Sequence, residues 1–169
     1  MLFRSLATAA SGLVDIGRQL CVVATASAAW AALRQDPRIV FCDDPGDLTQ
    51  LVELRRAVHD LVVLVDDADQ LLDTPLDAAV REMAALVDRD GGLVVVGARA
   101  ESVSAQYRGL AVAVARHRTG ILLGPTSGPA ADLLGARVPV DRAAGPGRGH
   151  LVTAGVAVPI QVASSTVRR

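Results

Sequence analysis

Two adjacent aspartates, Asp66 and Asp67, directly follow a run of five apolar residues, Leu61–Val65. A run of this length reads as a buried strand, which would place both carboxylates at the carboxyl end of a sheet, where open α/β proteins bind ligands. Magnesium takes oxygen ligands and keeps several waters, so one or two carboxylates suffice to hold it. Asp66 is therefore a candidate magnesium ligand. An alternative interpretation is that these aspartates, together with Asp69, only begin a turn and solvate the sheet edge.

An apolar strand that runs into an acidic pair resembles the Walker B strand of P-loop NTPases, which supplies an acid to the magnesium of a bound nucleotide. The partner motif, G-x-x-x-x-G-K-[ST], requires a lysine. This chain has none, because all 17 of its basic residues are arginine. In addition, Asp67 stands where active motors place a glutamate, and its side chain is one methylene shorter. The sequence therefore predicts one half of a nucleotide site.

Two arginines are further candidates for contact with a phosphate. Arg99 follows a second apolar strand, Gly92–Ala98, and such ATPases carry a polar sensor residue on this strand. Gly97 and Ala98 offer no side-chain hydrogen bond there, and Arg99 is either a phosphate ligand or a solvated charge at a strand end. Arg118 lies in a short basic cluster and is a candidate arginine finger towards a neighbouring subunit, with an ordinary surface charge as the alternative.

Composition sets the broad class. The chain has 169 residues, enough for one domain, and 51% of them are hydrophobic, so it can bury a core made mainly of aliphatic side chains. Its net charge of -1 gives no general attraction to nucleic acid or to anionic lipid. Cys21 and Cys42 lie in apolar runs, which favours two buried thiols. No apolar run has the ~20 residues of a membrane span, and we expect a cytoplasmic protein.

Helical and strand-like segments alternate along the chain, which predicts an α/β fold with a mostly parallel sheet, helices on both faces and a small C-terminal β-hairpin. The expected strands are 19–25, 38–42, 61–65, 93–98, 119–123, 150–153 and 158–162. The expected helices are 2–13, 27–34, 44–59, a helix that begins at 74–77, a segment over 101–115 broken at Gly109, and 129–134. The glycine-rich segment 145–149 leads into a strand, so it is interpreted as the entry to the hairpin.

Six segments, in this order and spacing, resemble the FtsK/SpoIIIE ATPase domain, most closely the degenerate C-terminal domains of actinobacterial members such as the EccC ATPases of type VII secretion. They are L-V-V-L-V-D-D-A-D (61–69), G-L-V-V-V-G-A (92–98), R-T-G-I-L-L-G-P (118–125), D-L-L-G-A-R-V-P (132–139), P-G-R-G-H-L-V (146–152) and P-I-Q-V-A (159–163).

The resemblance implies a RecA-like domain over residues 1–163, followed by a short tail, 164–169. It implies ATP and magnesium as cofactors, with Asp66 as the Walker B acid and Asp67 at the degenerate base position. It also implies a ring of FtsK/SpoIIIE-type ATPases that moves either DNA or small helical secretion substrates; the near-neutral charge does not support DNA. In the family a helix follows the P-loop at once, and residues 2–10 look like that helix, so the chain would be truncated at its N-terminus, without the P-loop strand.

Two hypotheses follow from the resemblance. The chain is either a degenerate, non-hydrolysing module with a structural or regulatory role, or part of a working DNA translocase or secretion motor whose P-loop lies upstream or in a partner chain. A response-regulator receiver domain also uses paired acids, but it places them after its first strand and requires a lysine near its last. An unrelated α/β domain without a ligand is the remaining alternative.

Overall fold

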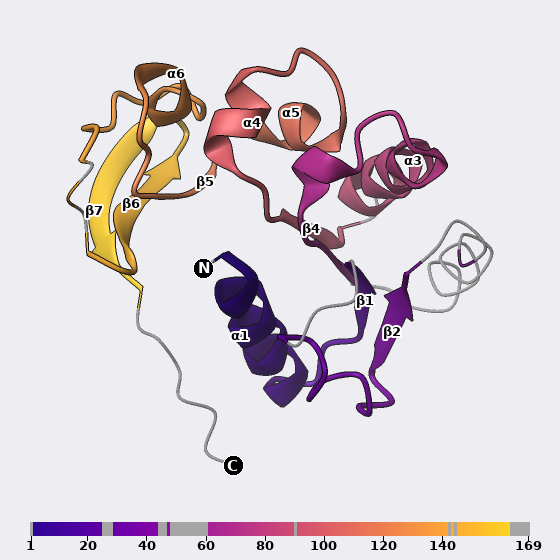
Figure 1. The fold of residues 1–169 in the computed structure, drawn as a ribbon. Coiled ribbons are helices and arrows are strands. Elements are labelled where there is room, and N and C mark those ends of the chain that lie inside the picture. The colour runs from indigo at the N-terminus through magenta and orange to yellow at the C-terminus, as the bar shows by residue number, and fades with distance from the viewer. Residues whose placement is uncertain are drawn as a thin grey trace. The chain divides into compact units, whose positions relative to one another are not determined.

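The computed structural model of this protein describes residues 2–24, 29–43, 47, 61–89, 91–141, 143 and 145–162, with backbone alone at 2–5 and 88. The predicted helix over 44–59 and the predicted tail therefore lie outside the described residues, apart from Asp47. The chain divides into two compact units, Met1–Gly97 and Ala98–Arg169, which are described separately below (Figure 1).

The first unit contains a four-stranded, all-parallel sheet in the order β2-β1-β3-β4. Its strands are β1 (Leu20–Val23), β2 (Ile39–Cys42), β3 (Val62–Val65) and β4 (Leu93–Val96). The register pairs Leu20 with both Ile39 and Val62, and Val62 with Leu93, so the four strands end at the same level. β1 and β3 are central and fully buried, as solid apolar runs in a parallel sheet require. The predicted parallel sheet is confirmed.

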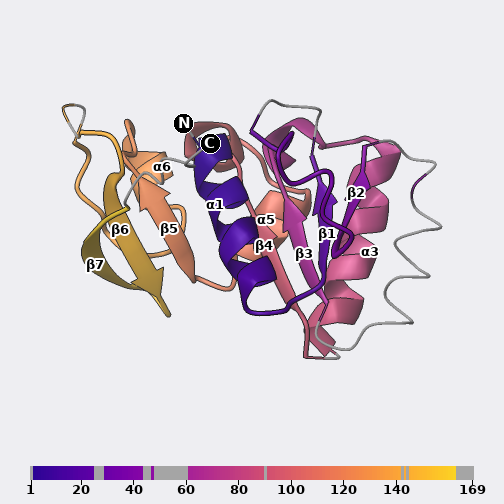
Figure 2. The ribbon, with the colours of Figure 1, turned by 90° about the horizontal axis from the view of Figure 1, so that it is seen from below.

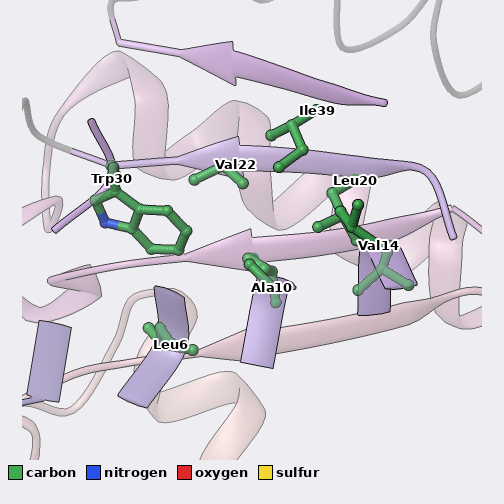
Figure 3. Packing of buried hydrophobic residues seen from close by; sticks show 10 residues of the cluster. Leu6, Ala10, Val14, Leu20, Val22, Trp30 and Ile39 are labelled. Atoms are coloured by element: carbon green, nitrogen blue, oxygen red, sulfur yellow. The ribbon is translucent and has the colours of Figure 1, made fainter. Parts of the chain in front are cut away.

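Helices α1 (Leu2–Asp15) and α3 (Pro75–Arg89) lie on opposite faces of this sheet (Figure 2). α1 buries Leu6, Ala10 and Val14, which recur every four residues and therefore share one face of the helix. These side chains pack with alternate residues of the strands, including Leu20, Val22 and Ile39 (Figure 3). On the other face, α3 buries Val80, Met83 and Val87. The prediction of helices on both faces is confirmed.

The start of α3 is set by local chemistry. Thr74 caps the helix: its Oγ1 accepts a hydrogen bond from the backbone N–H of Asp77 at 3.2 Å, and Pro75 occupies the first helical position. The helix predicted at 27–34 is not formed in its described part. Residues 29–35 form turns instead, in which the carbonyl of Trp30 accepts from the N–H groups of both Leu33 and Arg34.

The second unit is built on a three-stranded antiparallel sheet, β5 (Gly120–Leu123), β6 (Arg148–Thr153) and β7 (Val156–Gln161). β6 and β7 form the predicted C-terminal hairpin, and β5 pairs with β6. The helices α4 (Ala100–Ser104), α5 (Leu110–Ala115) and α6 (Gly128–Ala131) are short. The predicted break at Gly109 is present, since this residue has a φ of 101° and precedes α5.

One face of the three-stranded sheet packs into a small core that includes Leu122, Leu134 and Val152. The opposite face carries a row of aliphatic side chains, because Ile121 pairs with Leu151 and Leu151 pairs with Val158. All three are exposed.

Candidate functional site

Asp66 lies at the point in the sheet where a ligand is expected. The chain runs from β1 outward to β2, and then returns to place β3 and β4 on the other side of β1. The strand order therefore reverses between β1 and β3, and open α/β sheets bind ligands outside the carboxyl ends of the strands at such a point. The N–H of Asp66 donates to the carbonyl of Val23 at 2.8 Å, which fixes Asp66 beside the end of β1.

Both carboxylate oxygens of Asp66 are engaged by the protein itself. Trp30 donates from Nε1 to Oδ2 at 2.9 Å, and the N–H of Asp67 donates to Oδ1 at 3.2 Å. Asp66 is only 3% exposed. Its burial raises the pKa of the carboxyl group, and the hydrogen bonds from Trp30 and Asp67 oppose that rise. The carboxylate is thus a buried, hydrogen-bonded group.

The side chain of Trp30 packs next to Asp66, at the end of β3. This residue belongs to the turn that follows β1, and its side chain is fully buried in the same core as Leu6, Ala10 and Val22. Figure 3 shows its ring among these side chains. Its edge also meets Phe41, with ring centroids 6.0 Å apart in a T-shaped arrangement. The indole therefore lies buried against Asp66 at the end of β3.

Close packing around Gly97 explains why the residue at the predicted sensor position has no side chain. A β-carbon at Gly97 would collide with Cδ1 of Leu6 and lie 3.3 Å from Oδ1 of Asp66. Leu6 of α1 thus packs over the end of β4, directly beside the aspartate. Gly97 also accepts a hydrogen bond from the N–H of Ala68 at 2.9 Å, which ties the acidic turn to the end of β4.

The other acids of this region form parts of the local structure. Asp67 has a φ of 51°, a left-handed conformation that aspartate tolerates better than most residues, and it precedes a short 3₁₀ helix, Ala68–Gln70. Asp69 is buried within that helix. Asp77 is buried in the first turn of α3 and forms an ion pair with Arg81 at 3.2 Å. Within the described part of the chain, no three histidine, cysteine or acidic residues group together so as to hold a metal ion.

These observations test whether magnesium and ATP fit this site. A magnesium ligand has to present an oxygen to the ion and to its waters. Here both oxygens of Asp66 accept from protein donors, the side chain is enclosed, and the sequence contains no lysine to hold the β- and γ-phosphates. The residues do not fit a magnesium–nucleotide complex in this conformation.

The two candidate arginines belong to the second unit. Arg99 is exposed and stands at the N-cap of α4 without a side-chain capping bond. Arg118 donates from Nη2 to the carbonyl of Gly135 at 2.9 Å. A β-carbon at Gly135 would lie 2.7 Å from Nε of Arg118, and one at Gly155 would collide with Nη2. Two glycines therefore make room for this guanidinium, which links the loop after α6 to the turn between β6 and β7.

The two cysteines are thiols, not joined by a disulfide, on neighbouring strands. Cys21 on β1 and Cys42 on β2 are buried, and their sulfur atoms are 3.8 Å apart. The hydrogen bond between them raises the pKa of Cys21 far above its ordinary range, and burial acts in the same direction. The prediction of two buried thiols is confirmed.

Sequence reasoning did not assign Trp30 to the site. Trp30 lies within the predicted helix 27–34, which was given no role at the site, although the structure makes this residue the hydrogen-bond donor to Asp66. One signal was present: Trp30 is the only tryptophan in a chain with 2% aromatic residues. A buried indole needs an acceptor for its N–H, and the acidic pair is a source of acceptors.

No helix in the described ranges is both long and apolar enough to cross a membrane. Comparison of the chain with protein-family models, with curated proteins and with solved structures gave no match.

Proposed function

We propose that this chain is a degenerate FtsK/SpoIIIE-type ATPase domain that does not hydrolyse ATP and serves as a structural or regulatory module of a cytoplasmic secretion or translocase ATPase. The observation that carries the proposal is the state of Asp66. This residue has the position of a magnesium ligand at the end of a central strand, yet Trp30 binds its carboxylate in place of a ligand.

The fold and the motif order support the family part of this proposal. β3 delivers Asp66 from the centre of a parallel sheet, and β4 lies directly beside it, so the acid and the sensor position, Gly97, are neighbours. The loss of function is supported by the absence of lysine and by the small sensor residue. A module of this kind would act through its surfaces, within a ring of related ATPases.

Trp30 allows a direct test, because the only tryptophan of the chain contacts the only acid proposed for magnesium. We expect the fluorescence of the purified chain to stay unchanged when Mg–ATP is added, and ATP turnover to stay at background. The Asp66→Asn variant is the matched control and should behave in the same way. Saturable quenching or turnover that is lost in Asp66→Asn would falsify the non-hydrolysing proposal.

The structural role is tested by assembly. When the chain is mixed with an FtsK/SpoIIIE-type ATPase from the same source, we expect co-sedimentation in analytical ultracentrifugation, with an unchanged stoichiometry when ATP is omitted. Sedimentation of the two proteins as separate species at every concentration tested would remove the module hypothesis.

The second candidate function is part of an active motor, and strand β4 favours it. β4 is composed of Leu and Val alone, which is typical of a strand buried on both faces. However, Leu93 is exposed, and within the described residues β4 pairs with no strand other than β3. A strand that carries a lysine motif, from upstream sequence or from a partner chain, could pair at this edge.

The coding sequence before Met1 separates the two candidates. An in-frame glycine-rich G-K-[ST] motif there would favour the motor, and the longer protein should then hydrolyse ATP in an Asp66-dependent manner.

A further inference from the structure

The second unit contains a cavity of about 280 Å³ between the core-facing side of its sheet and the loop that precedes β6. Its size is close to the lower limit, ~300 Å³, of pockets that bind small molecules. Three prolines contribute much of its apolar wall: Pro125, Pro139 and Pro159. Three polar side chains, Asp141, Arg148 and His150, complete it. An apolar wall with a few polar groups is the usual composition of a ligand site.

His150 has a buried polar atom without a partner. It lies on the core-facing side of β6, opposite Leu122 on β5 and Pro159 on β7. Its Nδ1 is buried and forms no hydrogen bond with any residue that the structure describes. Such atoms are rare in folded proteins, because leaving one unpaired loses the hydrogen bond it would make in water. A ligand in the cavity would provide the missing partner.

The two charged residues of the cavity are also incompletely paired. The guanidinium of Arg148 makes no ion pair or side-chain hydrogen bond within the described ranges. Asp141 accepts a hydrogen bond from the N–H of Ala143 through Oδ1 at 3.0 Å, and this uses only one of its two oxygens. A cation, a carboxylate and an imidazole therefore all belong to residues that line the same small cavity.

We infer that this cavity binds a small zwitterion with an apolar side chain, that is, a free α-amino acid of the leucine type. Arg148 would bind the ligand carboxylate, since the guanidinium fork matches its two oxygens, and Nδ1–H of His150 would donate to one of them. Asp141 would accept from the ammonium group, and the prolines would contact the side chain. A simple anion would be repelled by Asp141, and a simple cation by Arg148. This inference does not depend on the proposed function.

The test is a titration of the ¹⁵N-labelled full chain, followed through the imidazole nitrogens of His150 and the backbone amides of β6. Three probes are compared: L-leucine, 4-methylpentanoate, which lacks the ammonium group, and 3-methylbutylamine, which lacks the carboxylate. We expect saturable shifts with L-leucine and a Kd on the order of 1 mM, and binding at least about tenfold weaker for the other two.

Variants then assign the contacts. Arg148→Gln should weaken L-leucine binding by about tenfold or more, and Arg148→Lys should weaken it less, because lysine keeps the charge but loses the fork. Arg116→Gln, an exposed arginine of the same unit that does not line this cavity, is the control and should leave binding unchanged. A dispersed amide spectrum establishes that each variant is folded.

Several results would overturn the inference. One is the absence of saturable shifts with all three probes, which would indicate that water alone satisfies Nδ1. Equal binding of 4-methylpentanoate and L-leucine would show that Asp141 does not bind the ammonium group. The ligand would then not need to be a zwitterion. Unchanged binding in a folded Arg148→Gln variant would remove the carboxylate contact.

Discussion

The end of β3 and the cavity beside β6 both enclose polar side chains, but only one of them satisfies those side chains internally. At the end of β3, the two oxygens of Asp66 accept from Trp30 and from the N–H of Asp67. Beside β6, Nδ1 of His150 is buried with no described partner. Buried polar groups cost little when they are hydrogen-bonded and much when they are not.

The two sites differ in two respects: how well the polar side chain is placed for a ligand, and whether one of its atoms still lacks a hydrogen-bond partner. Asp66 has the better position for a ligand, at the reversal of strand order in a parallel sheet, but it is buried and each of its oxygens already accepts a hydrogen bond from the protein. His150 lies in a small antiparallel sheet whose strand order does not indicate a ligand site. Its Nδ1, however, has no hydrogen-bond partner among the described residues. We therefore expect substitutions at the first site to change stability, and substitutions at the second to change binding.

The largest effect is expected at Trp30. Trp30→Ala removes a fully buried indole, and we expect the free energy of unfolding to fall by about 3–5 kcal/mol. Trp30→Phe keeps most of the apolar volume but removes the donor to Asp66, which should cost about 1–3 kcal/mol. Urea denaturation measures both changes.

A double-mutant cycle isolates the hydrogen bond. In an Asp66→Leu background the acceptor is absent, so Trp30→Phe should cost less there, with a coupling of about 0.5–3 kcal/mol. An equal cost in both backgrounds would contradict the closed-site description.

The next effect concerns Gly97. Gly97→Ala should destabilise the protein by about 1–3 kcal/mol, because its methyl group would overlap Leu6 beside Asp66. Gly12→Ala is the matched control in the same unit: Gly12 lies in α1, and a β-carbon added there would meet nothing within 4 Å, so alanine should be neutral or slightly stabilising. Thermal unfolding of the two variants compares them. Similar melting temperatures would argue against tight packing at the end of β4.

A pH series examines the buried carboxyl group. Burial raises the pKa of Asp66 in the folded protein, so the folded state holds its proton more tightly than the unfolded state does. The contribution of Asp66 to stability is therefore fully present below the unfolded pKa of about 3.9 and is lost as pH rises through the folded pKa. Asp66→Asn does not titrate, so its stability relative to the wild type should increase between about pH 4 and pH 7, by about 1.4 kcal/mol for each unit of pKa difference. A relative stability that falls over this range would show the opposite sign of the shift.

The smallest effect is expected at His150. His150→Phe replaces a ring with an unpaired buried nitrogen by an apolar ring, so the free energy of unfolding should stay constant or rise by up to about 1 kcal/mol. The same variant should lose L-leucine binding. A clear loss of stability would show that Nδ1 has a stabilising partner, and the contrast between the two regions would then disappear.

Most of the fold could be predicted because its signals are local. The runs around Leu20, Leu61 and Leu93 have the length and composition of buried strands, and Thr74-Pro75 marks a helix start through capping alone. The helix predicted over 27–34 was wrong in its described part. Small residues with good helical propensity occupy most of the segment 27–34, but burial of Trp30 against Asp66 favours turns.

The site could be predicted only in part, because its decisive contacts join distant residues. Asp66 was located by the strand that precedes it, whereas its donor Trp30 is 36 positions away in sequence. Likewise, nothing near Arg118 indicates that Gly135 and Gly155 surround its guanidinium. Pairing of β5 with β6 is also a long-range property, and the apolar run 119–123 fits a parallel sheet equally well.

The arrangement around Arg118 has a consequence for sequence variation. Gly135 and Gly155 have positive φ angles, and a side chain at either would run into the guanidinium. The guanidinium is the exposed end of a flexible side chain, so a side chain at either position would displace it from the carbonyl of Gly135. The positive φ angles would strain such a substitution even in a chain that lacks the arginine. In homologous chains, positions 135 and 155 should accordingly keep glycine more strictly than position 118 keeps arginine.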